Sequence, residues 1–240
     1  MNLAHDTSVA QVTLLRGADL VASPWKNGGG VTREIALANI PTAVPTAVPG
    51  AVPGAAPGEF AWRVSVADVA QAGPFSRFEG VARTLVLLEG AGMVLDETAP
   101  EGGAQVRTHT LARALDVACF DGEAPIDARL VDGPTRDFNL MVRRDAARAS
   151  FEVWRENVAR RIEADTVLLY CAQGEAKVRV NGAEPTPLAA GDTLRIDTTG
   201  ATGAADSSRA IRIETQGEGA LLAIALDIVN AHADRDPSRT

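Results

Sequence analysis

Short stretches rich in β-branched and aliphatic residues recur along almost the whole chain, and they constrain the fold more than any other feature. Turn-forming Gly, Pro, Asp or Asn separate them, and no long stretch shows the 3.6-residue periodicity of an amphipathic helix. Many short strands with turns between them predict an all-β sandwich or barrel. The predicted strands cover residues 31–37, 60–69, 83–90, 137–144, 151–156, 166–172, 176–180, 192–196, 210–214 and 220–226.

One segment departs from this pattern. Residues 156–164 (ENVARRIEA) have the spacing of a short helix, although the same residues could continue a pair of strands. It is the one helical candidate in the chain, and the sequence leaves helix and strand equally open.

The two halves of the chain have a similar layout. Residues 83–97 and 164–182 each read as strand, Gly-containing turn and strand. Residues 187–197 (PLAAGDTLRID) resemble a cupin pattern in which a Gly-Asp turn connects two barrel strands. The sequence therefore predicts an all-β bicupin, with jelly-roll β-barrel halves at 9–124 and 125–232.

Residues 39–58 carry a proline at every fourth position, from Pro41 to Pro57. Proline cannot donate to a sheet ladder and favours an extended chain, so we expect an exposed, mobile surface loop within the N-terminal half. A recognition site for a partner of proline-rich segments is the alternative. The stretch lacks the basic flank and the aromatic residues that such ligands often carry.

Charge and hydropathy limit the partners. The net charge is −8 and the pI is near 5.0, which argues against nucleic acid because phosphate binding needs a basic face. No apolar run approaches the roughly 18–20 residues that a membrane span needs, and the N-terminus lacks a basic leader followed by an apolar stretch. We expect a cytoplasmic protein.

Cys119 and Cys171 lie in apolar, strand-like segments, which predicts two buried thiols with a disulfide as the alternative.

The residues of a metal site or a nucleophilic catalytic site are missing from the sequence. Histidine occurs only at His5, His109 and His232, and no two of these lie within strand spacing. A site with three histidines is thus excluded, and His109 is expected at the surface. The chain also lacks a G-x-S-x-G elbow and a phosphate-binding loop that leads into a helix. We therefore predict no metal, no cofactor and no catalytic residue.

The stretch PWKNGGGVTREI (24–35) combines three successive glycines with Lys26, one of only two lysines in the chain. Such glycines permit left-handed backbone and close approach of another group. They indicate either a tight corner between strands or a wall of exposed amides beside a pocket, with Lys26 supplying charge.

Alternation along the strands places several polar side chains on one face. Arg63 and Ser65 oppose Trp62 and its apolar neighbours, Asn139 and Arg143 oppose Phe138, and Arg83 shares a face with leucines. A buried arginine must be paired or must serve a ligand, because an unpaired buried charge is costly. Glu34, Asp68 and Asp137 are the candidate partners. The alternative is a guanidinium that binds a carboxylate ligand.

Three blocks of the chain, taken in order, resemble the HutD/Ves family. They are residues 24–35, residues 60–95 and residues 130–145 (LVDGPTRDFNLMVRRD). Residues 150–240 match more loosely, as a second cupin half, and the proline-rich stretch is a departure from the family pattern. The resemblance implies a metal-free bicupin and a link to histidine utilisation, or, for the Ves branch, to stress and cold response.

The resemblance also implies a ligand site in the N-terminal half. Phe75 and Phe78 are expected to close its apolar side. The candidate ligand-binding residues are Lys26, Asn27, Thr32, Arg63, Ser65, Phe75, Arg83, Asn139 and Arg143.

The leading hypothesis for function is a non-enzymatic protein that binds a small anionic metabolite, a carboxylate such as formylglutamate, and thereby regulates histidine utilisation. The alternatives are a metal-free cupin isomerase or lyase and a Ves-like stress-response protein. Acid–base chemistry usually needs a His or Tyr beside a carboxylate, but the single tyrosine, Tyr170, lies in the half with fewer motifs and His109 is isolated. A third possibility is a partner-binding protein that uses the proline-rich loop. A homodimer is compatible with all of these functions.

Overall fold

A computed structural model describes residues 10–40, 60–99, 105–198 and 209–229, and strands dominate these ranges. They contain no α-helix, only the 3-10 turn η1 (Gly17–Asp19). The all-β prediction is confirmed, and each of the ten predicted segments overlaps an observed strand. The proline-rich segment falls outside the described residues, apart from its first two positions.

Of the two alternatives for residues 156–164, the helix is wrong and the strand is observed. Residues 159–163 form strand β13 (Ala159–Glu163), which pairs antiparallel with β18 (Ala210–Gly217). Ile162 packs against a hydrophobic core from this strand. The two arginines and the glutamate of β13 are exposed, so one apolar contact and sheet pairing override the local helical spacing.

The chain divides into two compact units, each described here by itself. The first unit comprises residues 21–148 with 228–229, and the second comprises 10–20 and 149–227. These limits differ from the predicted boundary at 124/125. Strand β10 (Ile126–Leu130) pairs with β7, and β11 (Thr135–Arg143) lies between β4 and β6, which keeps both strands in the first unit.

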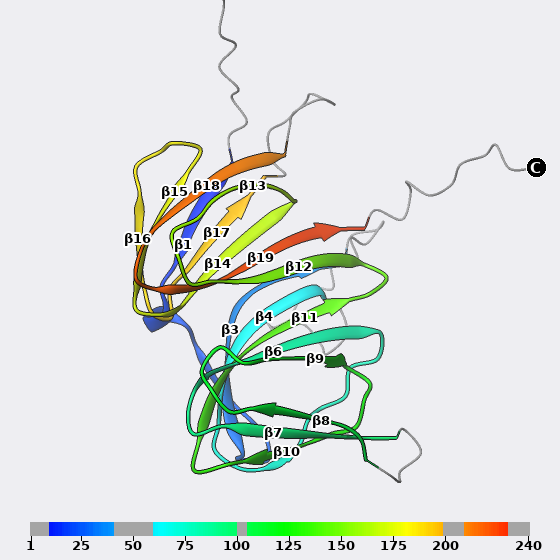
Figure 1. The fold of residues 1–240 in the computed structure, drawn as a ribbon. Helices are drawn as coiled ribbons and strands as arrows, with labels where there is room; N and C mark the ends of the chain where they lie inside the picture. Colours follow the sequence, from blue (N-terminus) through cyan, green and yellow to red (C-terminus); the bar gives the residue numbers. More distant parts are fainter. Residues whose placement is uncertain (1–9, 41–59, 100–104, 199–208, 230–240) are drawn as a thin grey trace, which may run out of the picture. The chain divides into compact units, whose positions relative to one another are not determined.

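Two antiparallel sheets build the first unit (Figure 1). The six-stranded sheet has the order β2 (Ala22–Pro24), β3 (Gly30–Asn39), β4 (Phe60–Val69), β11, β6 (Val81–Glu89) and β9 (Val117–Asp121). The four-stranded sheet has the order β5 (Gly73–Pro74), β10, β7 (Met93–Thr98) and β8 (Gln105–Leu111). Alternate residues of both sheets form one core cluster, in which Leu85 and Leu87 of the larger sheet join Met93 and Leu95 of the smaller one.

The second unit also combines two sheets. The five-stranded sheet has the order β1 (Gln11–Leu15), β17 (Thr193–Asp197), β14 (Thr166–Gln173), β19 (Ala220–Ile228) and β12 (Ala147–Trp154). The four-stranded sheet has the order β13, β18, β15 (Glu175–Val180) and β16 (Thr186–Ala189). Its core cluster draws on aliphatic residues of both sheets, such as Leu169, Val178 and Ile213.

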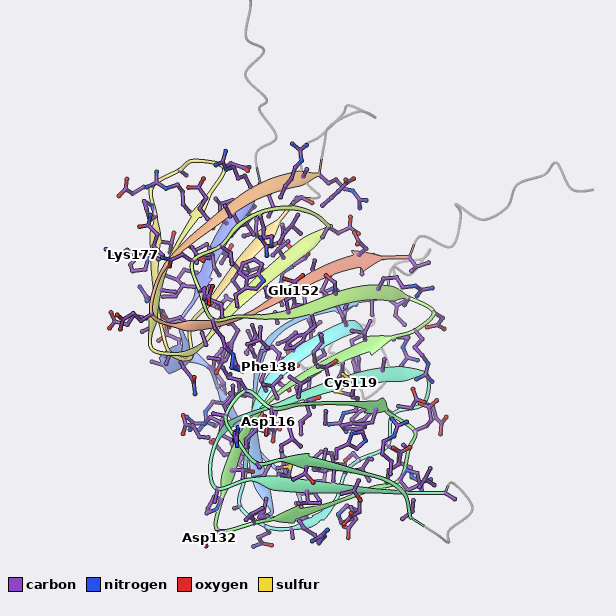
Figure 2. The ribbon with its side chains drawn as sticks, viewed as in Figure 1. Asp116, Cys119, Asp132, Phe138, Glu152 and Lys177 are labelled. Carbon is purple, nitrogen blue, oxygen red and sulfur yellow. The ribbon has the colours of Figure 1, made fainter. Side chains whose placement is uncertain are left out.

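The cysteines differ from each other. Both are free thiols, and Cys171 is buried in the core of the second unit as expected. Cys119 is exposed on β9 (Figure 2), so the prediction of two buried thiols is wrong for this residue. Its segment alternates, and Ala118 and Phe120 take the inward positions.

None of the described segments forms a helix with the length and hydropathy needed to cross a membrane.

The three glycines between β2 and β3 have different physical roles. Gly28 has a φ of +72°, in the left-handed region that favours glycine. Gly30 has no room for a side chain, because a Cβ would lie 2.5 Å from the backbone oxygen of Asp68 and 3.0 Å from the Trp25 ring. Gly29 would place a Cβ 3.3 Å from the side chain of Asn27, which can move. The corner therefore depends most strictly on Gly28 and Gly30.

Alanine substitutions at Gly29 and Gly30 should differ in their effects on stability. Gly30→Ala forces a Cβ against a backbone carbonyl and should lower the free energy of unfolding by about 1–3 kcal/mol. Gly29→Ala meets only a side chain and should stay within about 0.5 kcal/mol of the wild type or exceed it slightly. Urea denaturation of the two variants measures the difference, and equal losses would contradict this account of the corner.

Candidate ligand-binding site

The first unit contains a cavity of about 590 Å³. Eight of the nine predicted site residues line it, and only Arg143 does not. The lining residues come from β2 to β6, the intervening turns, and β11: Ser23, Pro24, Trp25, Lys26, Asn27, Thr32, Arg63, Ser65, Ala67, Pro74, Phe75, Ser76, Phe78, Arg83, Leu85, Asp137, Asn139 and Met141.

The register of three neighbouring strands explains this convergence. On β11, Met141 lies between Arg63 of β4 and Arg83 of β6. Two residues earlier, Asn139 lies between Ser65 and Leu85. Because side chains alternate across a sheet, residues two apart on each strand point to the same face, so all of these reach one cavity.

The same register puts Asp137 among core residues. Its partners on the neighbouring strands are Ala67 and Leu87, both members of the core cluster of the first unit. On this face of the sheet, the side chains are polar at one end of the strands, where Arg63 and Arg83 lie, and aliphatic at the other end. Asp137 is a carboxyl group at an aliphatic level of the sheet.

Arg83 is buried, with 7% of its surface exposed, and its Nε has no hydrogen-bond partner among the described residues. The guanidinium carbon lies 5.1 Å from the ring centres of Phe75 and of Phe120 and 5.8 Å from that of Phe78. Burial lowers the pKa of Arg83 to about 10, against the opposing effect of the Asp137 charge. The side chain is therefore a desolvated cation held by aromatic faces.

Asp137 is 2% exposed, and its Oδ2 has no hydrogen-bond partner in the described part of the chain. Burial raises the pKa of Asp137 to about 7. The charge of Arg83 acts to lower this pKa, and that of Asp68 adds to the increase. Asn139 repeats the pattern, since its buried Oδ1 also lacks a partner there.

Arg63 is in a different electrostatic position from Arg83. Its Nε donates to Glu34 Oε2 at 2.8 Å, and both side chains are partly exposed. Asp68 is also engaged, because Arg33 and Arg136 donate to its two oxygens at 2.5 and 2.7 Å. The expected ion pair with Glu34 is thus present for Arg63, whereas Arg83 keeps an unpartnered Nε.

The residues just before β3, from Ser23 to Asn27, line the cavity. Trp25 Nε1 donates to Thr32 Oγ1 at 2.8 Å, and Asn27 Oδ1 accepts from the backbone N–H of Gly29 at 3.0 Å. The Gly30 carbonyl accepts from Trp25 N at 2.9 Å, and the three glycines are not among the lining residues. The geometry favours the tight-corner interpretation, with Lys26 and Asn27 presented to the cavity beside it.

Two expected positions need correction. Arg143 lies outside the cavity lining, and its guanidinium donates to the backbone oxygens of Phe60 at 3.3 Å and Glu79 at 3.5 Å. These two hydrogen bonds connect the end of β11 to the backbone at Phe60 and at Glu79. His109 is not a surface residue: its side chain is 13% exposed, its Nε2 lies 3.5 Å from Glu97 Oε2, and its ring centre lies 6.0 Å from that of Phe120. It faces inward because β8 packs on the core.

Asp137 is the lining residue that the sequence interpretation used only as an ion-pair partner. It lies two residues before Asn139, so strand alternation alone could have placed both on the cavity face. Within the described residues, no group of three or more His, Cys, Asp or Glu side chains is arranged to hold a metal ion.

Sequence comparison relates the chain to HutD and Ves proteins. The HutD family model matches residues 17–223. An uncharacterised 21.2 kDa protein in the hutC 3' region of Pseudomonas putida is 32% identical over 194 residues, 79% of this chain and 88% of the relative. Protein Ves of Citrobacter koseri is 36% identical over 130 residues, which span 54% of this chain and only 56% of Ves.

Solved structures agree. HutD from Pseudomonas fluorescens SBW25 superposes with a TM-score of 0.70 at 28% identity, covering 92% of this chain and all of that one. A conserved protein of unknown function from Pseudomonas aeruginosa PAO1 gives a TM-score of 0.72 at 29% identity, over 90% of this chain and 99% of that one. YlbA of Escherichia coli, at 9% identity and a TM-score of 0.56, shares the fold alone. The chain belongs to the HutD family.

Proposed function

We propose that this protein binds a small carboxylate in the cavity of its first unit, without transforming it, and that binding regulates histidine utilisation through an intermediate such as formylglutamate. The observation that carries the binding proposal is Arg83. A buried guanidinium that lines a cavity and has a partnerless Nε is costly to the unliganded protein. A carboxylate would supply the missing acceptor.

Physical chemistry favours a carboxylate at this position. The planar guanidinium can donate two parallel hydrogen bonds to the two oxygens of one carboxylate, and such a charged pair strengthens away from water. Lys26 and Arg63 also line the cavity, so three basic groups face the space against one buried carboxyl. In a chain with net charge −8, this concentration of positive charge selects anions.

The regulatory part of the proposal comes from the family. The Pseudomonas putida relative is named for its place beside hutC, and the Pseudomonas fluorescens neighbour is named HutD. A non-enzymatic regulator needs only reversible binding, which the cavity can provide.

We also propose that the two units are the two jelly-roll barrels of a bicupin. Each unit combines a larger and a smaller antiparallel sheet around one core cluster. That arrangement is typical of a double-sheet jelly roll.

A second candidate is a metal-free isomerase or lyase, and Asp137 is the observation that favours it. A carboxyl group whose pKa is about 7 and which lines a cavity suits general acid–base catalysis. Deuterium exchange at the α-carbon of a bound hydroxy acid or N-acylglutamate, followed by NMR, would reveal such proton transfer. We expect no exchange above the rate without protein.

Replacing Arg83 should weaken carboxylate binding. Arg83→Met keeps much of the aliphatic part of the side chain and removes the guanidinium group. The affinity for N-formylglutamate, measured by calorimetry, should therefore fall by about tenfold to a hundredfold. Arg63→Met should have a smaller effect, because Glu34 already pairs with that guanidinium. Arg113→Met, at an exposed position, is the matched control and should bind like the wild type. Unchanged affinity in Arg83→Met would refute the proposed site.

The stability of the unliganded protein should depend on pH through Asp137. Its folded pKa of about 7 exceeds its ordinary value of 3.8, so the folded state holds this proton more tightly than the unfolded state. Stability is therefore lost as pH rises from about 4 to about 7. Asp137→Asn cannot ionise, so its free energy of unfolding, relative to that of the wild type, should be about 1–3 kcal/mol larger at pH 8 than at pH 5. A difference that does not change with pH would contradict the burial of an ionising carboxyl.

A further inference from the structure

Asp137 and Asn139 present two unused hydrogen-bond acceptors to the same cavity as Arg83. Asp137 Oδ2 and Asn139 Oδ1 are both buried, and neither has a partner among the described residues. Both residues lie on β11, point to the same face and line the cavity. Such buried polar atoms are rare in proteins unless water or a ligand satisfies them.

A plain carboxylate would not satisfy these atoms. Its oxygens are acceptors, so it can pair with Arg83 but offers nothing to Asp137 and repels that group when it is ionised. A ligand that displaces water from these atoms without replacing the hydrogen bonds loses affinity. A ligand that adds an N–H or O–H group near its carboxylate gains the missing bond.

We propose that Asp137 and Asn139 form an acceptor subsite that selects, among small carboxylates, those that also carry a hydrogen-bond donor such as an amide N–H or a hydroxyl. The inference rests on the proposed function, because Arg83 must bind the carboxylate before Asp137 and Asn139 can accept a hydrogen bond from the rest of the ligand. The ligand class is thus hydroxy acids and N-acylamino acids rather than simple acids.

The charged groups around Asp137 make this selection dependent on pH. Arg63 and Asp68 come from β4, Arg83 from β6, and Lys26 from the turn before β3. Asp68 does not titrate near neutrality: burial raises its pKa, but hydrogen bonds from Arg136 and Arg33 bring it below the usual value. Asp137 has a pKa of about 7, so its charge changes in this range.

The sign of the dependence differs between the two kinds of ligand. A donor ligand favours the ionised form of Asp137, so its affinity should rise with pH through about 7 and then level off. A carboxylate without a donor favours the protonated form, so its affinity should fall over the same interval.

The test uses the full chain and two pairs of nearly isosteric probes, in which a hydroxyl replaces a methyl group. Glycolate is compared with propionate, and 2-hydroxyglutarate with 2-methylglutarate. Affinities between about pH 6 and pH 8.5, where the probe carboxylates are ionised, are measured by NMR from the indole N–H of Trp25, which lines the cavity. At pH 8 we expect the hydroxyl member of at least one pair to bind about tenfold more tightly.

Two variants test whether Asp137 causes the preference for hydroxyl probes and the opposite pH slopes. Asp137→Asn should remove the opposite pH slopes and shrink the preference for the hydroxyl probe. Asp132→Asn, an exposed position in the turn between β10 and β11 (Figure 2), should leave both unchanged. The wild-type comparison remains decisive if Asp137→Asn fails to fold, because it needs no variant.

The outcomes separate the two proposals. Equal affinities and parallel pH slopes within both pairs, with binding still weakened in Arg83→Met, would overturn the acceptor subsite and leave the carboxylate site intact. Failure of all four probes to bind the wild type would overturn both. Opposite slopes that vanish in Asp137→Asn support the subsite.

Discussion

The burial of one cation, Arg83, and one carboxyl group, Asp137, in the same face of a β-sheet is the constraint on which the site depends. The opposite charge of each group favours the ionised form of the other, but burial outweighs this attraction, so the pKa of the arginine falls to about 10 and that of the aspartate rises to about 7. Neither Arg83 Nε nor Asp137 Oδ2 has a hydrogen-bond partner among the described residues. Within the described residues these two buried polar atoms are thus left for water or a ligand to satisfy.

The frame that holds these groups could be predicted from the sequence to a large extent. Alternation placed Arg63, Ser65, Arg83 and Asn139 on one face, and the register of β4, β11 and β6 brings them to one cavity. Alternation failed for Arg143 because a side chain at the end of a strand can turn toward nearby backbone oxygens. Which arginine is paired could not be predicted, since that depends on Glu34 reaching across from β3 to β4.

Short strands and long-range pairings set the other limits of sequence interpretation. Strands such as β2 and β5 are too short to carry a periodic signal and exist only because a neighbouring strand pairs with them. The division between the units was also hidden, because β10 and β11 follow the predicted boundary in sequence yet pair with β7, β4 and β6. Strand β13 is a further case in which long-range pairing decides the structure, because its pairing with β18 overrides a helical pattern in the local sequence.

The position of Asp137 bears on why such a site would be retained. Its neighbours across the sheet are Ala67 and Leu87, and an aliphatic residue there would extend the core and avoid the cost of an unpartnered carboxyl. Arg83, at the polar end of the cavity, likewise has a buried Nε without a partner among the described residues, which costs stability. Since single polar-to-apolar changes at both positions offer a route to greater stability, a binding requirement is the simplest physical reason for keeping both groups. In the proposed function, their separation along the sheet would select molecules with an anionic end for Arg83 and a donor for Asp137.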